Sequence, residues 1–260
     1  MLSITSRNND KIKHAVKVCS DSSYRRKTNS FFLEGLRLCC DAAINGYVAE
    51  TVFVTEKSLS EHGEEIKILL DSCKESFVIT EEISLKLSDT KNPQGVFCIC
   101  KILDKSIYID KINYNGMYIA LENVQTPANL GAVARTAEAL GLDGIVVSGG
   151  CDIYNPKALR AAMGALLRLD IIRVDNLRNF ISECKTKGMN VYAAVPDSDA
   201  LPVTQIDKKD GVICAVGNEG NGLSDEVISA CTRITIPMSG RAESLNAATA
   251  ASVIMWEMVR

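Results

Sequence analysis

The second half of the chain alternates short apolar runs with longer amphipathic stretches. The apolar runs predict strands at 117–121, 144–148, 170–174, 190–195, 211–216 and 233–236. The stretches between and after them predict helices at 130–140, 157–169, 177–187, 224–231 and 244–259. Near-continuous apolar strands separated by helices are typical of a parallel sheet that is covered on both faces. We therefore predict an α/β domain that binds its ligands beyond the carboxyl ends of the strands.

The first hundred residues alternate in a similar way, but they form a smaller unit. Strands are predicted at 30–34, 50–55, 76–79 and 95–100, and helices at 36–45 and 60–73. An irregular, polar stretch follows at 101–115. We predict a small α/β domain at 1–101, a linker at 102–115 and a second domain at 116–260.

Composition narrows the class of protein. The chain has 260 residues, of which 47% are hydrophobic and 23% are charged, as in soluble globular proteins. No apolar stretch is long enough to cross a bilayer, and the N-terminal segment lacks the apolar core of a secretory signal. We expect a cytoplasmic protein without a membrane segment.

Cysteine is abundant, but its spacing favours neither disulfides nor a metal site. The ten cysteines form no CxxC pair, and neither of the two histidines, His14 and His62, lies near a cysteine cluster. We expect reduced thiols that act as small hydrophobic side chains, and no metal.

Basic residues gather at the start of a chain whose formal net charge is −3. Residues 1–30 contain seven Lys or Arg and two Asp. Such a run is compatible with a solvated helix face and, equally, with a surface that contacts a phosphate backbone. The charges alone leave both interpretations open.

The segment GNEGNG (217–222) combines three glycines with a carboxylate directly after a predicted strand. Glycines at such a turn allow the backbone to approach a ligand closely. A tight connection without a ligand would also use them. The order GxxGxG differs from the GxGxxG of a dinucleotide-binding turn, and no acidic residue follows the next strand. A dinucleotide-dependent oxidoreductase is therefore disfavoured.

Two further turns carry polar side chains that a plain core does not require. In IPMSGRAESLN (236–246), Ser244 is a candidate N-cap of the last helix, whereas capping does not readily explain Asn246. In NVQTPANLGAVARTA (123–137), Asn129 is a candidate N-cap. The apolar face of the helix that follows leaves Arg135 on another side.

These motifs together resemble the SpoU/TrmH family of S-adenosylmethionine-dependent RNA ribose 2′-O-methyltransferases. The resemblance rests on N-x-G-x-x-x-R-T-A, G-x-E-G-x-G-L and I-P-M-x-G-x-x-x-S-L-N, in this order, and covers roughly 115–260. SRNNDKIKHAVKV, FFLEGLRLCCDA and NPQGVFCIC are similar, in their order, to the substrate-binding domain that precedes many members. The resemblance implies a trefoil-knotted α/β fold, a homodimer and an active site near the subunit interface.

The resemblance also implies a set of site residues and a substrate. The catalytic and structural polar set would be Asn129, Arg135, Glu219, Ser244 and Asn246. S-adenosylmethionine would contact Gly217, Asn218, Gly220, Gly222, Ile236, Met238 and Leu245. RNA would contact Arg7, Lys11, Arg25, Arg26 and Lys27. The separate N-terminal domain favours 23S ribosomal RNA; transfer RNA, or a silent RNA-binding protein of the same fold, is the alternative.

Two points of this chain bear on the mechanism. Many members have Asp-Pro where this chain has Thr126 and Pro127, which leaves the conformation of that loop open. The family role assigned to the arginine is general base, yet a guanidinium is charged at physiological pH and has no acceptor lone pair. Arg135 is better suited to pair with an RNA phosphate and lower the pKa of the ribose hydroxyl, unless it is transiently deprotonated.

Overall fold

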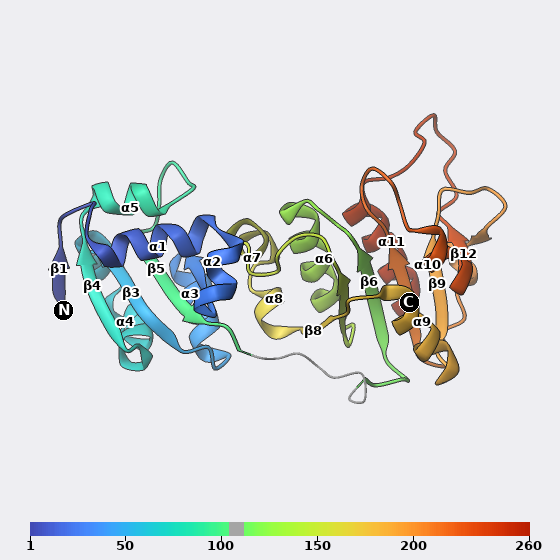
Figure 1. Ribbon diagram of the computed structural model, residues 1–260, viewed down its shortest axis with the longest axis horizontal. Helices are drawn as coiled ribbons and strands as arrows, with labels where there is room; N and C mark the ends of the chain where they lie inside the picture. The colour runs from blue at the N-terminus through green and yellow to red at the C-terminus, as the bar shows by residue number, and fades with distance from the viewer. Residues whose placement is uncertain (104–111) are drawn as a thin grey trace. The chain divides into compact units, whose positions relative to one another are not determined.

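The computed structural model describes residues 1–103 and 112–260 (Figure 1). Part of the predicted linker, at 104–111, lies outside the described residues. The chain divides into two compact units. The first contains Met1–Asp104 and Asp152–Leu167, and the second contains Lys105–Cys151 and Arg168–Arg260. Within the described ranges, no helix is long and apolar enough to cross a membrane.

A five-stranded sheet forms the centre of the first unit, in the order β1-β4-β3-β5-β2. Its strands are β1 (Leu2–Ile4), β2 (Ser30–Glu34), β3 (Ala49–Thr55), β4 (Glu75–Ile79) and β5 (Val96–Lys101). Strand β5 runs antiparallel to both of its neighbours, and the other pairs are parallel. The four strands predicted from apolar runs are confirmed, and the short edge strand β1 is additional.

Among the residues that the structure describes, seven helices belong wholly or largely to this unit. They are α1 (Asp10–Ser20), α2 (Ser22–Thr28), α3 (Leu36–Ile44), α4 (Glu56–Ser72), α5 (Glu81–Leu87), α7 (Pro156–Ala162) and α8 (Ala165–Arg168). Helices α1 and α5 cover one face of the sheet, where Ile12 and Ile83 pack against Phe32, Phe53 and Phe97. All five of these side chains are fully buried, so this face is a complete hydrophobic core.

The second unit is built on a seven-stranded sheet in the order β10-β12-β9-β11-β6-β7-β8. Its strands are β6 (Met117–Glu122), β7 (Gly144–Ser148), β8 (Asp170–Arg173), β9 (Asn190–Ala194), β10 (Leu201–Pro202), β11 (Val212–Val216) and β12 (Thr232–Thr235). Every pair is parallel; in the central pair, Val212 is opposite Met117. The prediction of a parallel sheet is confirmed.

Helices cover both faces of this sheet (Figure 1). Helices α9 (Leu177–Thr186) and α10 (Asp225–Ala230) share a core with Tyr118 and Ala120 of β6. The alternate residues Ile119 and Leu121 are also buried. They face the opposite side, where α6 (Pro127–Ala139) packs beside α11 (Ala247–Val259). Since successive strand residues point to opposite faces, burial of both sets explains the continuous apolar runs.

The helix expected at 157–169 is two helices. Asn155 caps the start of α7 as predicted, but Met163 and Gly164 have φ of +52° and +92°. Two successive positive φ angles end the helix, and α8 begins at the next residue. The segment Asp152–Leu167 packs with the first unit, although it falls within the predicted domain at 116–260.

Candidate active site

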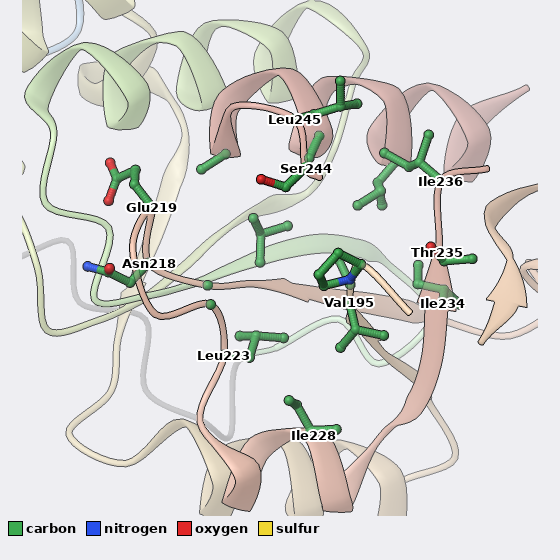
Figure 2. A pocket seen from close by; sticks show the side chains of 18 of the residues that line it. Val195, Asn218, Glu219, Leu223, Ile228, Ile234, Thr235, Ile236, Ser244 and Leu245 are labelled. Atoms are coloured by element: carbon green, nitrogen blue, oxygen red, sulfur yellow. The ribbon is translucent and has the colours of Figure 1, made fainter. Parts of the chain in front are cut away.

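A cavity of about 350 Å³ lies at the carboxyl ends of β9, β11 and β12 (Figure 2). Its volume is within the range of small-molecule sites, and its position is where parallel α/β sheets bind ligands. All seven residues predicted to contact a cofactor line it: Gly217, Asn218, Gly220, Gly222, Ile236, Met238 and Leu245. Glu219 and Ser244 line it as well. The structure thus brings two of the three sequence motifs to one place.

The glycine turn, residues 217–222 after β11, is closed by a small backbone bridge. The backbone N–H of Asn218 donates to Gly222 O and the N–H of Gly222 donates to Asn218 O, both at 3.0 Å. A Cβ on Gly217 would lie 2.1 Å from the carbonyl carbon of Gly222, and Gly222 itself has φ of +69°. The turn therefore requires glycine at 217, directly before the bridge, where there is no room for a Cβ, and it favours glycine at 222, where φ is positive.

Asn218 fixes the interior of this turn. Its Oδ1 accepts hydrogen bonds from the backbone N–H of Gly220 at 2.8 Å and of Asn221 at 3.1 Å. Its Nδ2 donates to Asn123 O at 2.9 Å, which ties the glycine turn to the loop after β6. The backbone of the turn is thus preorganised before any ligand binds.

The carboxylate of Glu219 holds that loop after β6, which we call the first loop (residues 123–126). Its oxygens accept from the backbone N–H of Gln125 at 3.2 Å and of Thr126 at 3.1 Å. They also accept from Asn129 Nδ2 at 2.8 Å. Partial desolvation acts to raise the pKa of Glu219, but the hydrogen bonds that the carboxylate accepts outweigh it and lower the pKa to about 2. Glu219 is therefore ionised at every working pH.

A polar chain continues from Glu219 to the last helix. Asn246 Nδ2 donates to Asn129 Oδ1 at 3.1 Å, and Asn129 is buried. Asn246 Oδ1 in turn accepts from the backbone N–H of Ala248 at 2.9 Å and of Thr249 at 3.3 Å. The three motifs therefore meet through their side chains, although they are far apart in the sequence.

Both capping predictions at this site were wrong. Helix α6 begins at Pro127 with Thr126 as N-cap, so Asn129 lies inside the first turn and is free to bind Glu219. Proline suits this first position because its missing N–H would have no helical partner. Asn246, rather than Ser244, is the N-cap of α11. An asparagine can cap a helix and still donate through its Nδ2, which explains why this side chain is used here.

The remaining predicted polar residues lie apart from this chain of hydrogen bonds. Ser244 is exposed and lines the cavity on the segment that precedes α11 (Figure 2). Arg135 is exposed on α6 and is not among the residues that line the cavity. Of the four residues predicted for the core face of this helix, Val133, Ala134 and Ala137 are buried, whereas Leu140 is half-buried and forms the C-cap.

Several apolar residues of the cavity were not predicted from the sequence. They are Ala194, Val195, Pro196, Val203, Val216, Leu223, Ile228, Ile234, Ala247, Ala250 and Ile254, together with Thr235 and Asn221. Figure 2 shows Leu223 and Ile228 on the side opposite Ser244 and Leu245. The available signal was the position of Val195 and Pro196 directly after a predicted parallel strand, since ligands sit at that end.

The predicted RNA-contacting residues differ widely in exposure. Arg25 is only 3% exposed, and it donates to Asp152 Oδ2 at 2.8 Å and to the carbonyls of Val18 and Cys19 at 2.9 Å. The prediction that Arg25 contacts RNA was therefore wrong: burial and an internal carboxylate use its charge. Arg26 and Lys27, the next two residues of α2, are exposed.

Two other basic residues have acidic partners on the surface of the same unit. Arg7 pairs with Glu82 at 3.0 Å, and Lys11 pairs with Glu75 at 2.5 Å. Exposed pairs of this kind are weak, so they leave both side chains able to exchange partners. The prediction of RNA contacts at Arg7, Lys11, Arg26 and Lys27 remains a prediction.

All ten cysteines carry free thiols, and five of them are buried. Burial raises the pKa of Cys184 and of Cys231 to about 12 each, so these thiols stay protonated at neutral pH. Among the described residues, no group of three or more His, Cys, Asp or Glu side chains is placed to hold a metal ion.

Two family models match the chain. The model of the SpoU rRNA Methylase family matches residues 116–256, and that of the MRM3-like substrate binding domain matches residues 9–98. The first match contains all three motifs of the site. The second covers most of the first unit's N-terminal part.

Relatives and solved structures agree with these matches over nearly the whole chain. The 23S rRNA (guanosine(2553)-2′-O)-methyltransferase RlmP of Bacillus subtilis is 28% identical over 260 residues, covering 99% of each chain. The 23S rRNA (uridine(2479)-2′-O)-methyltransferase of Streptomyces viridochromogenes is 26% identical, covering 99% of this chain and 91% of its own. The AdoMet-bound rRNA methyltransferase of Sinorhizobium meliloti superposes with a TM-score of 0.87 at 28% identity, over 98% of this chain and 96% of its own. The chain belongs to the SpoU rRNA methylase family.

Proposed function

We propose that this protein transfers a methyl group from S-adenosylmethionine to a ribose 2′-hydroxyl of 23S ribosomal RNA. The observation that carries the proposal is the cavity at the ends of β9, β11 and β12, which the second and third family motifs line together. Relatives over the full length of the chain are named as enzymes of this reaction. A structure related over its full length is named as bound to AdoMet.

The lining of the cavity fits such a cofactor. Aliphatic side chains such as Leu223, Ile228 and Ile254 suit the faces of an adenine ring, and the backbone of the glycine turn offers polar groups nearby. Ile236, Met238 and Leu245 would complete the pocket on the side of the third motif. Bound there, S-adenosylmethionine supplies an electrophilic methyl group on a sulfonium.

Glu219 serves this reaction by positioning rather than by taking a proton. Its carboxylate already accepts hydrogen bonds from Gln125, Thr126 and Asn129, and its pKa of about 2 makes it a very weak base. What it does is hold the first loop and the start of α6 beside the cavity. Much of a methyl transfer can come from such alignment of the reacting groups.

Arg135 is the residue we assign to the ribose hydroxyl. Its guanidinium is exposed on α6, and none of the described carboxylates forms an ion pair with it. An unpaired guanidinium can bind an RNA phosphate in a bidentate manner and stabilise negative charge that develops on a nearby oxygen. It lowers the pKa of the hydroxyl without accepting its proton.

We further propose that the protein acts as a homodimer on RNA. Trp256 of α11 is 54% exposed, and tryptophan is enriched at protein interfaces. It belongs to the helix that packs beside α6, so pairing over this face would place Arg135 near a subunit interface. In the first unit, Arg26 and Lys27 supply exposed positive charge for the RNA backbone.

Methyl transfer is tested directly with tritium-labelled S-adenosylmethionine and total unmodified bacterial RNA, fractionated by size. The expected result is label in large ribosomal RNA that survives alkali as a 2′-O-methyl dinucleotide. Label in the transfer RNA fraction would instead identify transfer RNA as the substrate. No transfer to any fraction would make this a binding protein and end the proposal.

The role of Arg135 is tested with Arg135→Ala and the charge-conserving Arg135→Lys. We expect the alanine variant to lose at least about a hundredfold in single-turnover rate, the scale of one electrostatic contact in a transition state. The lysine variant should retain part of the rate. Cofactor affinity, measured by calorimetry, should stay unchanged in both. Parallel losses of rate and cofactor affinity would instead make Arg135 a structural residue.

A further inference from the structure

The segment Asp152–Leu167 leaves the second unit directly after β7 and returns directly before β8. Between these two points it packs with the first unit. The unit proposed to bind RNA therefore holds a piece of chain whose two ends are fixed inside the catalytic unit. Such a segment can transmit a restraint only if its middle and both of its ends are held in place. The contacts described below hold all three.

Three contacts between buried or half-buried side chains hold the segment on the first unit, and a longer pair joins Arg160 Nη2 to Asp89 Oδ2 at 3.7 Å. Arg25 Nε donates to Asp152 Oδ2 at 2.8 Å, and the arginine is almost fully buried. The ring of Tyr154 lies 4.8 Å from that of Phe31, centroid to centroid. The third contact is between Arg160 Nη1 and Glu34 Oε2, at 2.7 Å.

These contacts are anchored in regular structure. Arg25 also donates through Nη1 to the last carbonyls of α1, those of Val18 and Cys19. Asp152 also accepts the backbone N–H of Tyr154 at 3.0 Å, which shapes the turn before α7. Arg25 and Asp152 thus each make further hydrogen bonds within their own segments. These bonds fix the orientation of both side chains, in addition to the attraction between their charges.

The outgoing end of the segment is held against the first loop. The N–H of Cys151 donates to Val124 O at 2.8 Å, and the N–H of Asn123 donates to Ser148 O at 2.8 Å. A Cβ on Gly150 would lie 2.4 Å from Val124 O, so the two loops are in close backbone contact. This first loop is the one whose next two N–H groups bind Glu219 at the cavity.

The returning end is held against α6. Arg168 Nη2 donates to Glu138 Oε2 at 2.7 Å, and this hydrogen bond acts with the charge of Arg168 to lower the pKa of Glu138. Glu138 lies one turn beyond Arg135 on the same helix. Both ends of the segment therefore act on the first loop and α6, the elements that carry Asn129 and Arg135.

We propose that Asp152–Leu167 is a coupling segment, and that Arg25, Asp152 and Arg160 are positioning residues for methyl transfer. By holding the segment, the first unit fixes the first loop and α6 in the arrangement that the cavity requires. The effect on methyl transfer rests on the proposed function. The control of the first loop by the segment does not depend on it and can be tested without the reaction.

The test uses the full-length protein with Asp152→Asn and Arg160→Gln, which break the segment's contacts at two separate points. Asp152→Asn keeps an oxygen for the N–H of Tyr154. The control is Lys157→Gln, which removes an exposed charge of the same segment whose nearest acidic group, Asp89, is 3.9 Å away. Thermal unfolding checks that all variants are folded.

The first measurement is amide hydrogen exchange over the first loop, residues 123–126, without RNA. We expect faster exchange in Asp152→Asn and in Arg160→Gln, and wild-type exchange in Lys157→Gln. This readout does not depend on activity. Exchange that is unchanged in both variants would overturn the coupling, even if the protein proved to be an active methyltransferase.

The second measurement is the single-turnover rate with saturating S-adenosylmethionine and an unmodified 23S ribosomal RNA transcript. We expect both variants to lose about tenfold to a hundredfold in rate, the scale on which small misplacements act. The dissociation constants for RNA and for the cofactor should change little. Faster exchange with an unchanged rate would show that the segment is merely structural and overturn the proposal. No transfer by the wild type would refute the proposed function, and exchange would still decide the coupling.

Discussion

Replacing Gly217 by alanine should distort the glycine turn and weaken cofactor binding without unfolding the protein. The added Cβ would lie 2.1 Å from the carbonyl carbon of Gly222 and 2.2 Å from the backbone nitrogen of Leu223. Both are backbone atoms, so rotation of a side chain cannot relieve the overlap. The two strands of the turn must move apart, and the bridge between Asn218 and Gly222 must open.

The size of the effect follows from the bonds that are lost. The bridge consists of two backbone hydrogen bonds at 3.0 Å. At about 1 kcal/mol each, they amount to about 2 kcal/mol of preorganisation. Since about 1.4 kcal/mol corresponds to a tenfold change in affinity, cofactor binding should weaken by about thirtyfold.

The assay is calorimetric titration of the purified protein with S-adenosylmethionine. Gly220→Ala is the matched control, because its Cβ would meet only Asn218 Oδ1, at an ordinary contact distance of 3.4 Å. Its dissociation constant for the cofactor should lie within about threefold of the wild-type value, because a threefold change corresponds to less free energy than one hydrogen bond contributes. Thermal unfolding of both variants shows whether the loss is local.

The reasoning would be refuted if Gly217→Ala bound the cofactor as tightly as the wild type. It would also be refuted if the two variants lost affinity equally, because the glycine turn would then tolerate no side chain anywhere. In that case contact with the ligand, rather than the backbone bridge, would control the affinity.

Three further predictions concern other residues. Asn246→Ala should destabilise the protein by about 1–2 kcal/mol, because it removes the N-cap of α11, whereas Ser244→Ala should be nearly neutral; denaturant unfolding distinguishes them. The pKa of Glu219, about 2, is below its value of about 4.3 in an unfolded chain, so its stabilising effect is complete above that value and is lost as the pH falls towards 2. The stability difference between wild type and Glu219→Gln should therefore be full at neutral pH and shrink below pH 4.3, and a constant difference would contradict the assignment. Reversing the charges of Arg26 and Lys27 should weaken RNA binding and flatten its dependence on salt, measured by filter binding, while an unchanged slope would exclude them from the RNA surface.

The periodicity of the sequence located the strands of both sheets except the short edge strands β1 and β10, and it missed helices α1, α2 and α5 of the first unit. Apolar runs located the strands of the parallel sheet, and β7 has the predicted bounds, Gly144–Ser148. Polar residues directly after these runs then located the cavity, because the carboxyl ends of neighbouring parallel strands meet at one edge. Periodicity does not predict the trefoil knot. It depends on how the chain threads, which local periodicity does not encode, and it stays a prediction.

The sequence did not predict which residues far apart along the chain pair with one another. The charge of Arg25 suggested an RNA contact, but its partner Asp152 lies 127 positions away, and only the folded chain shows that the arginine is buried beside it. Likewise, the sequence placed Glu219 in a ligand-binding turn, whereas the donors that saturate its carboxylate come from a loop more than 90 positions earlier.

The sequence by itself therefore determined most of the segments that form strands, which turns are rich in polar groups and which end of the sheet carries the cavity. These depend on the side-chain period and on backbone preferences that act within a few residues. The tertiary structure alone decided which charges are buried, which polar groups are already bonded, and that Asp152–Leu167 packs with the first unit. Hydrogen bonds and ion pairs depend on distance in space, and the fold brings together residues that no local pattern relates.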